Sequence, residues 1–400
     1  INDEIFDLEL TPNRGDCLSL NGILRDLNVF YDIDLSNELF LDDISLFEFD
    51  FDNKIQDICP KISFMKIDIE DTVKDYNGEL KSFFKELGNN KNNFFTDVSN
   101  YISYETGQPT HCYDYQKING KLILEQINQD TEFHTLLGKK INLVDKNNVF
   151  SIDNNVINLA GVVGGMDSSC SVSTKSVLIE CAFFKPEAII GKSVKYDIQS
   201  DAAHKFERGV DYKNQENTLR RFAHIVGKHV KIKDIKFVTY EFNKIQPTKL
   251  NFNSKKINEI LGIEEEAGKL SEYLNKINIT IKNKTALIPS YRNDIKTIND
   301  LAEEIARIIG YNNIPPKEIF LTPKPKNNIL DSENIIRTYL INNGFSEVIN
   351  QPFVYENNEN SIKIDNPIDS NKKYLRTSLK NSLIENLLFN ERRQQESIKL

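Results

Sequence analysis

Residues 159–211 read LAGVVGGMDSSCSVSTKSVLIECAFFKPEAIIGKSVKYDIQSDAAHKFERGVD, and this stretch decides how the rest of the chain is interpreted. Small residues and glycines open it, and the apolar run Val177–Cys181 then predicts a strand. The glycines match neither GxGxxG nor GxxxxGK[ST], so a nucleotide-binding loop is not expected here. On spacing alone, Gly161–Gly165 indicates a tight turn between strands.

The stretch belongs to a longer region, residues 46–240, that mixes short strands with helices. Alternating apolar residues over Ile62–Ile69 predict a strand, and Phe94–Tyr104 predicts a helix. A further helix is predicted from Asn214 to Lys228, with Gly227 as the signal that ends it. Strands and helices do not alternate regularly, so we expect an α+β fold with a mixed α/β domain rather than a doubly wound parallel sheet.

Three further segments flank this region and indicate a multidomain chain. Residues 1–45 predict a strand over Ile5–Leu10 and a helix that Asp16 caps, a piece too small to fold alone. Residues 245–318 predict two helices, a hairpin and a third helix, an order that resembles a winged-helix-like module. Residues 327–400 follow a proline-rich linker and predict two helices with the strand Val348–Val354 between them.

Composition excludes several classes of protein. The 400 residues carry a net charge of −9, which argues against binding nucleic acid mainly by bulk charge. No stretch of about 18 apolar residues occurs, so no membrane-spanning helix is expected. The five cysteines form no CxxC pair, which argues against a cysteine-based zinc site and fits free thiols in a reducing compartment. The start of the chain, Ile1-Asn2-Asp3-Glu4, has no signal-peptide pattern and indicates a piece of something longer.

Taken as a whole, residues 159–211 resemble a segment of the β subunits of bacterial phenylalanyl-tRNA synthetases. That family shows Ala-Gly, two apolar residues and Gly-Gly, then Glu-x-Ala-Phe-Phe, then Thr-Asp-Ala-Ser-His-Arg-Phe-Glu-Arg-Gly-Val-Asp. Residues 97–118, DVSNYISYETGQPTHCYDYQKI, are similar to its Asn-Tyr…Gly-Gln-Pro-x-His-x-Phe-Asp segment. The resemblance covers nearly all of the chain, and the similar segments occur in the family's order. The further segments are residues 8–27 (LELTPNRGDCLSLNGILRDL, with Gly15 in place of a proline), 288–315, 343–354 and 366–387.

The resemblance implies a function and a set of partners. It implies a tRNA-editing (B3/B4-like) domain over residues 46–240, a B5-like domain over 245–318 and a truncated, catalytically inactive class II synthetase-like antiparallel sheet domain over 327–400. The family's α subunit uses ATP to charge tRNA(Phe) within a cytoplasmic α2β2 heterotetramer, and its β subunit hydrolyses tyrosine wrongly attached to that tRNA. The family's other terminal domains have no counterpart, which implies an incomplete β subunit with no cofactor-binding site of its own.

Editing of this kind has a physical reason. A hydrophobic phenylalanine pocket cannot strongly reject an isostere that merely adds a hydroxyl group. A second site that hydrogen-bonds the hydroxyl selects tyrosine, because phenylalanine leaves the site's buried polar group without a partner.

The resemblance assigns six residues to the editing site. Glu180 would accept the tyrosine phenol, a task that suits a carboxylate because it only accepts hydrogen bonds. His111 would lie beside the hydrolytic water, and Gly164 would leave room for the substrate. Without the resemblance, Glu180 indicates a surface residue at the end of a strand. The full set is Asn100, His111, Gly164, Glu180, Ser200 and Ala202.

A group of acidic residues indicates a second site. Asp300, Glu303 and Glu304 are spaced i, i+3 and i+4 and share one face of a predicted helix, and Asp294 precedes them. Carboxylate oxygens suit Mg²⁺ or Ca²⁺. Spacing alone favours a simpler interpretation, in which Asp300 caps the helix and the glutamates complement its first turn. The resemblance implies a magnesium ion held by all four residues and shared with the α subunit.

Two other functions remain open from the sequence. The first is a free-standing editing hydrolase, against which the last 75 or so residues and the acidic group argue, since both resemble subunit contacts. The second is a non-catalytic RNA-binding or structural subunit. The presence of Asn100, His111, Gly164 and Glu180 argues against that alternative.

Overall fold

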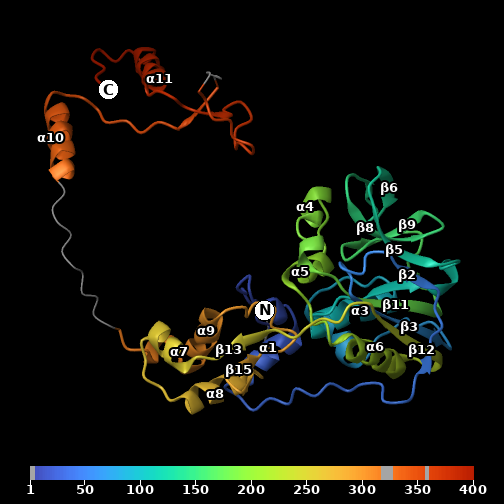
Figure 1. Cartoon of the computed structure of the whole chain (residues 1–400). Coiled ribbons are helices and arrows are strands. Elements are labelled where there is room, and N and C mark those ends of the chain that lie inside the picture. Colours follow the sequence, from blue (N-terminus) through green and yellow to red (C-terminus); the bar gives the residue numbers. More distant parts are fainter. Residues whose placement is uncertain (1–4, 317–327, 356–359) are drawn as a thin grey trace. The chain divides into compact units, whose positions relative to one another are not determined.

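A computed structural model describes residues 5–316, 328–355 and 360–400 of the chain (Figure 1). The chain divides into two units, Ile1–Lys317 and Glu318–Leu400, and each is described by itself. Within the described ranges, no helix has the length and apolar character needed to cross a membrane.

A five-stranded sheet with the order β1-β12-β3-β11-β4 lies at the centre of the first unit. Strand β3 (Lys61–Ile69) pairs antiparallel with β11 (Ser176–Phe183) on one side and with β12 (Ile232–Glu241) on the other. The short β4 (His111–Asp114) pairs with the free side of β11, and β1 (Ser45–Leu46) runs parallel to β12. Strand β11 therefore has hydrogen-bonded neighbours on both sides, which holds its residues rigidly.

A second five-stranded sheet packs on the first. Its order is β10-β9-β8-β5-β2. Its strands are β2 (Phe51–Asn53), β5 (Leu122–Ile127), β8 (Asn147–Ile152), β9 (Asn155–Leu159) and β10 (Val163–Gly164), and a hairpin of β6 (Thr131–His134) and β7 (Lys140–Leu143) lies beside it. The turn predicted over Gly161–Gly165 is present at Gly161, whose φ is +70°, but Gly164 already belongs to β10.

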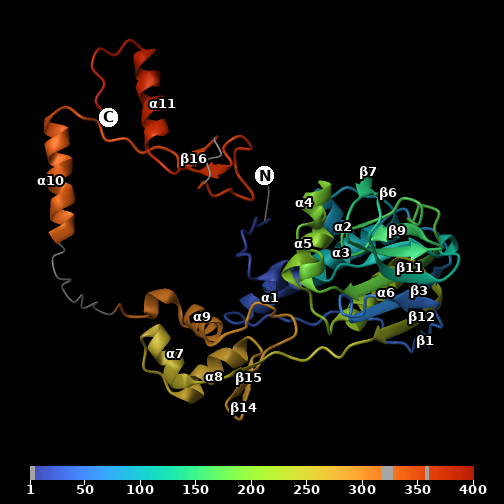
Figure 2. The ribbon, with the colours of Figure 1, turned by 45° about the horizontal axis from the view of Figure 1, so that its top comes forward.

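The period-two alternation of the central strands separates two cores. Even-numbered side chains such as Phe64 and Leu178 pack between the two sheets. Odd-numbered ones such as Ile67 and Ile179 pack under helices on the other face. These helices are α2 (Gly78–Glu86), α3 (Phe94–Thr106) and α6 (Gln215–His229), and α6 lies along β3 in both ribbon views (Figure 2). The domain thus has three layers, helices on sheet on sheet.

Two of the predicted helix signals are wrong. Helix α6 ends at His229, one residue beyond the predicted Lys228, but Gly227 lies inside the helix and does not end it, because its backbone does not adopt the left-handed conformation of a C-terminal glycine cap. Helix α1 (Leu20–Leu27) is capped by Ser19, whose hydroxyl accepts a hydrogen bond from Gly22 N, and not by Asp16. The predicted strand Ile5–Leu10 has no strand pairing in the structure.

Two short helices, α4 (Lys192–Tyr196) and α5 (Asp201–Arg208), follow β11.

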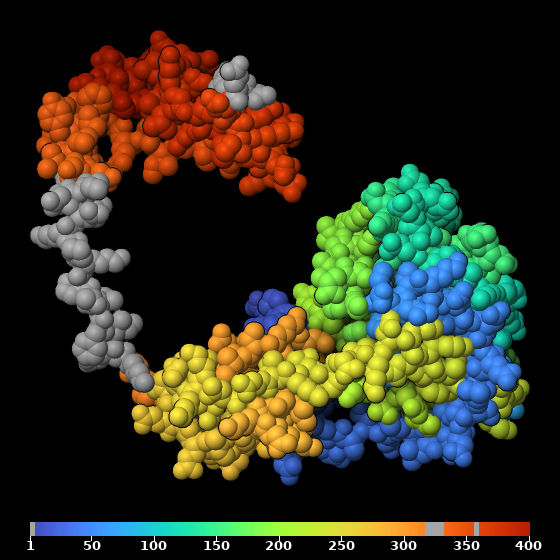
Figure 3. All heavy atoms as spheres, in the orientation of Figure 1, coloured from blue at the N-terminus to red at the C-terminus, as the bar shows by residue number. Residues whose placement is uncertain are grey.

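A separate small core joins the N-terminal segment to residues 249–309. The predicted helices and hairpin are present there, and an extra strand completes a three-stranded sheet. Val29, from the N-terminal segment, packs into this core, and the two segments form one continuous surface (Figure 3). The elements are β13 (Lys249–Asn251), α7 (Ser254–Leu261), α8 (Ala267–Lys276), β14 (Thr280–Lys282), β15 (Thr285–Leu287) and α9 (Ile298–Ile309).

The second unit contains helices α10 (Asn328–Asn342) and α11 (Lys380–Glu391). Between them, β16 (Phe353–Val354) pairs with β17 (Tyr374–Leu375), and Lys363 forms an isolated antiparallel bridge with Tyr374. The strand predicted over residues 348–354 is therefore shorter than expected, and the predicted antiparallel sheet is a two-stranded ribbon.

Candidate functional site

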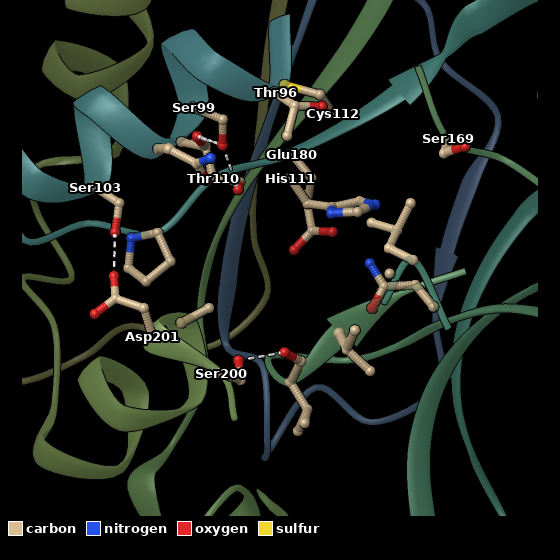
Figure 4. A pocket seen from close by; sticks show the side chains of 18 of the residues that line it. Thr96, Ser99, Ser103, Thr110, His111, Cys112, Ser169, Glu180, Ser200 and Asp201 are labelled. Atoms are coloured by element: carbon tan, nitrogen blue, oxygen red, sulfur yellow. Dashed lines mark hydrogen bonds between the residues drawn. The ribbon is translucent and has the colours of Figure 1, made fainter. Parts of the chain in front are cut away.

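A cavity of about 480 Å³ lies where β4, β10 and β11 meet helices α3 and α5 (Figure 4). Each of these five elements supplies at least one of the residues that the sequence assigns to editing. All six line the cavity: Asn100, His111, Gly164, Glu180, Ser200 and Ala202. Residues separated by up to about 100 positions along the chain are thereby gathered around one space.

Glu180 lies in the middle of β11, opposite His111 of β4 in the strand register. It is only 5% exposed, so it is not the surface residue that spacing alone suggests. The hydroxyl of Tyr113 donates a hydrogen bond to its Oε2 at 2.9 Å. Burial raises the pKa of Glu180 to about 8, although the hydrogen bond from Tyr113 opposes that rise. The cavity therefore contains a carboxyl group that accepts one hydrogen bond from the protein and retains capacity for another.

His111 supplies a ring nitrogen without a hydrogen-bond partner to the same space. Its Nε2 is buried, and none of the described residues hydrogen-bonds that nitrogen. Burial lowers the pKa of His111 to about 4, so the imidazole is neutral near pH 7. In the tautomer with the proton on Nδ1, this neutral ring accepts a hydrogen bond at Nε2 from a water molecule in the cavity.

Gly164 keeps the cavity open. A Cβ atom at this position would collide with the ring of His111 and would lie 2.8 Å from Cδ1 of Leu136. The φ angle of Gly164 is not in the left-handed region, so the backbone itself does not require glycine. Glycine is needed here because of the space beside His111.

The N-terminus of α5, marked by Ser200 in Figure 4, and the exposed Asn100 of α3 complete the lining. Ser200 caps α5, because its Oγ accepts a hydrogen bond from Ala203 N at 3.1 Å and donates one to Val162 O at 2.5 Å. Ala202 follows in the first turn of the helix. The hydroxyl of Ser200 thus anchors α5 to the loop before β10, which sets the position of Ala202.

Sequence reasoning missed two residues of the site. Asn158 of β9 donates a hydrogen bond from Nδ2 to the hydroxyl of Tyr113 at 2.8 Å, and Tyr113 in turn contacts Glu180. The spacing could have identified Tyr113, since it follows His111 by two residues and strand residues i and i+2 share a face. Cys112 packs into the helix-side core and also reaches the edge of the cavity, and burial raises the pKa of its thiol well above the usual value.

The four predicted magnesium ligands do not converge. Asp300 forms a capping box with Thr297 at the start of α9, as the simpler interpretation of the spacing expected. Glu303 is exposed. Asp294 and Glu304 both bind the guanidinium of Arg292, at 2.8 and 2.6 Å.

These contacts do not fit a cation as the side chains stand. The guanidinium of Arg292 occupies the place between Asp294 and Glu304 that a metal ion would need, and Arg307 takes the second oxygen of Glu304. Across the described ranges, no group of three or more His, Cys, Asp or Glu side chains is arranged to hold a metal. The magnesium ion stays a prediction from the resemblance.

Three protein-family models match the chain in succession. The B3/4 domain matches residues 59–231, which include the cavity. The tRNA synthetase B5 domain matches residues 250–311. The phenylalanyl tRNA synthetase beta chain CLM domain matches residues 316–400.

Comparison with curated proteins gives relatives named phenylalanine–tRNA ligase beta subunit. Those of Francisella tularensis and Fusobacterium nucleatum are each 30% identical, and that of Photorhabdus laumondii is 28% identical. Every alignment covers 100% of this chain but only 52–53% of the relative, so the chain spans about half the length of these proteins. A solved N-terminal fragment of the phenylalanyl-tRNA synthetase beta subunit from Pyrococcus horikoshii aligns with a TM-score of 0.38 and 14% identity, over 75% of this chain and 85% of that one.

Proposed function

Because the chain belongs to the family of phenylalanine–tRNA ligase β subunits, we propose that the cavity at Glu180 hydrolyses tyrosine that has been wrongly esterified to tRNA(Phe). The observation that supports this most is the burial of Glu180 inside a cavity, where it is 5% exposed. A buried carboxyl group without a cationic partner is costly unless a ligand supplies a hydrogen-bond donor. The phenol of tyrosine is such a donor, and phenylalanine has none.

The geometry supports a hydrolysis by positioned water. The tyrosyl side chain would donate its phenol hydrogen to Glu180, which fixes the ester at the other end of the side chain. A water molecule held by Nε2 of His111 would then attack the ester carbonyl. The water oxygen forms the new bond to carbon, the bond to the ribose oxygen breaks, and a proton passes to that oxygen, leaving tyrosine and free tRNA.

In this proposal a partner subunit attaches the amino acid to the tRNA. The relatives are named as β subunits, so we expect an α subunit that charges tRNA(Phe) with ATP, in a cytoplasmic α2β2 assembly. The net charge of −9 gives this chain little bulk attraction for RNA. The five cysteines, all buried and free, agree with a reducing compartment.

Replacing Glu180 with glutamine tests the function directly. We expect hydrolysis of tyrosyl-tRNA(Phe) at about pH 9, above the pKa of Glu180, to fall roughly 10- to 100-fold in kcat/KM, because a buried hydrogen bond from the phenol to a charged group is lost. The slow hydrolysis of phenylalanyl-tRNA(Phe) should not change. The assay measures release of labelled amino acid from both tRNAs, with the exposed Glu132 replaced by glutamine as the matched control.

Equal hydrolysis of both tRNAs by the natural chain would contradict the proposal. The assay is repeated with an α subunit added, because the chain spans only about half of its relatives. Absence of hydrolysis under both conditions would leave a structural subunit.

The selectivity should also depend on pH. The pKa of Glu180, about 8 in the free chain, means that the stronger acceptor, the carboxylate, forms as the pH rises through that value. We expect the ratio of kcat/KM for the tyrosyl over the phenylalanyl ester to increase between about pH 6 and about pH 9, since kcat/KM reports the free enzyme. His111, with a pKa of about 4, adds no change in this range. The ratio for the glutamine variant at position 180 should be flat, and a flat ratio for the natural chain would contradict the role of Glu180.

A further inference from the structure

A second phenol already contacts Glu180 from behind the cavity wall. Tyr113 is completely buried, and its hydroxyl accepts a hydrogen bond from Asn158 Nδ2 at 2.8 Å and donates one to Glu180 Oε2 at 2.9 Å. Its ring packs edge-on against the ring of His111, with centroids 4.4 Å apart. Tyr113 therefore contacts both residues on which the proposed hydrolysis depends.

We propose that Tyr113 is a positioning residue of this site: its hydroxyl holds Oε2 of Glu180, so that Oε1 is the oxygen left to accept the phenol of a misattached tyrosine. The inference rests on the proposed function. The terminal torsion of a glutamate is broad, so an unheld carboxyl group samples many orientations. A hydrogen bond to one oxygen, from a phenol that Asn158 fixes in turn, removes that freedom before the substrate binds.

The chain itself supplies the geometry for this arrangement. Tyr113 and His111 are separated by one residue on β4 and share a face, and β4 pairs with β11 so that Glu180 lies opposite His111. The family segment quoted above has phenylalanine where this chain has Tyr113. The hydroxyl is therefore an addition to that pattern and not a requirement for filling the core.

The same hydrogen bond affects the ionisation of Glu180. Burial raises the pKa of Glu180, and the bond from Tyr113 opposes the rise. Burial and the proximity of Glu180 raise the pKa of Tyr113 well above its usual value, so the phenol remains a donor. His111 is one of the other titratable groups around Glu180 or across the cavity. The others are four thiols with raised pKa values and a carboxylate paired with Lys205: Cys59, Cys112, Cys170, Cys181 and Asp201.

Replacing Tyr113 with phenylalanine separates the hydroxyl from the ring. The ring still packs on His111, but Oε2 of Glu180 loses its donor. We expect kcat/KM for tyrosyl-tRNA(Phe) to fall roughly tenfold, with little change for phenylalanyl-tRNA(Phe). We also expect the pH at which tyrosine selectivity appears to rise by roughly one unit, because a bond that favours the charged carboxylate is gone.

A matched control exists in the same domain. Tyr76 is buried, and its hydroxyl donates to Asp97 at 2.6 Å, but neither residue lines the cavity. Replacement of Tyr76 with phenylalanine removes the same kind of phenol–carboxylate bond and should leave both the rate and the pH dependence unchanged. A purely structural role of Tyr113 would lower the midpoint of thermal unfolding without moving the pH profile.

A second, nearly isosteric variant should shift the pH profile of tyrosine selectivity in the opposite direction. This test remains valid even if the phenylalanine variant does not fold. Site-specific 3-fluorotyrosine at position 113 is a stronger donor, so the selectivity should appear at a lower pH than in the natural chain. If the pH profile of tyrosine selectivity is unchanged in both variants, the proposed role of Tyr113 is wrong. If the phenylalanine variant does not fold, the same result in the fluorinated chain alone is sufficient. Tyrosine-selective hydrolysis by the natural chain would still support the proposed function in either case. Loss of selectivity in the natural chain would overturn both.

Discussion

Replacing Gly164 with alanine is expected to reduce hydrolysis of tyrosyl-tRNA(Phe) by roughly 100-fold, because displacement of a catalytic group by about 1 Å costs that much. The new methyl group would occupy the position of the His111 ring and would also press on Leu136. The ring must turn or move away, and the cavity loses volume beside His111, where the proposed water would attack the ester.

The fold should tolerate this substitution. The φ angle of Gly164 is open to all residues, and its carbonyl would still accept the hydrogen bond from Leu136 N at 2.9 Å. We therefore expect the circular dichroism spectrum of the natural chain and only a modest decrease in unfolding temperature. The loss should appear for the tyrosyl ester in single-turnover deacylation.

Gly227 provides the matched control. It lies in α6 of the same domain, where an added Cβ would meet only Cδ1 of Ile232 at 3.8 Å. Alanine at this position should raise stability by about 0.5–1 kcal/mol and leave deacylation unchanged. Full activity of the alanine variant at position 164 would mean that the ester does not bind beside His111.

Replacing Arg292 with methionine is expected to lower the free energy of unfolding by about 3–5 kcal/mol, the typical cost of removing one partner from a buried ion pair. The guanidinium is 2% exposed, and the side chains of Asp294 and Glu304 that it binds are 8% and 5% exposed. Methionine fills much of the volume but leaves two buried carboxylates, of which only Glu304 keeps a cation, Arg307. Urea unfolding measures the change, with Lys256→Met, which breaks an exposed pair with Glu259, as a control that costs well under about 1 kcal/mol.

The loss of unfolding free energy in the Arg292→Met variant should become smaller as the pH falls. Burial alone would raise the pKa of Glu304, but its contacts with Arg292 and Arg307 lower it to about 2. A carboxyl group with a depressed pKa stabilises the fold above its unfolded value of 4.5 and loses that contribution as the pH falls towards about 2. The difference between the natural chain and the variant should therefore be largest near neutral pH and shrink towards about pH 3.

The Arg292→Met variant also tests the predicted magnesium site. Stabilisation of the methionine variant by magnesium chloride, absent in the natural chain, would indicate that Arg292 fills a place suited to a cation. A cost below about 1 kcal/mol at neutral pH would show that the carboxylates reach solvent and that the burial argument is wrong.

Local patterns predicted the central strands well and some of the helix ends poorly. The alternation over Ile62–Ile69 was sufficient to predict β3, because one face packs on a sheet and the other on helices. Gly227 was misleading because it lies inside α6, which ends two residues later at His229 and is capped by Val230.

The candidate site shows the same division between local and tertiary information. The resemblance supplied six lining residues, but residue spacing alone placed Glu180 on the surface, because burial depends on the strands that pair with β11. Helical spacing grouped Asp300, Glu303 and Glu304 correctly on α9, yet it could not show that Arg292 takes the carboxylate of Glu304. Charge partners from another segment are invisible to a helical pattern.

The ion pairs between α1 and α9 have a consequence for synthesis on the ribosome. Arg307 binds Asp26 at 2.7 Å, and these residues are 281 positions apart. At about 5–20 residues per second, translation delivers the partner roughly 15–60 s after Asp26 has left the exit tunnel. Throughout that interval the domain between them can complete its sheets, while Asp26 has only Arg14 of its own segment as an ion-pair partner. Joining the two ends of the first unit thus comes after the B3/4 domain between them can fold, and a chain released before α9 is made would carry a folded B3/4 domain and an undocked N-terminal segment.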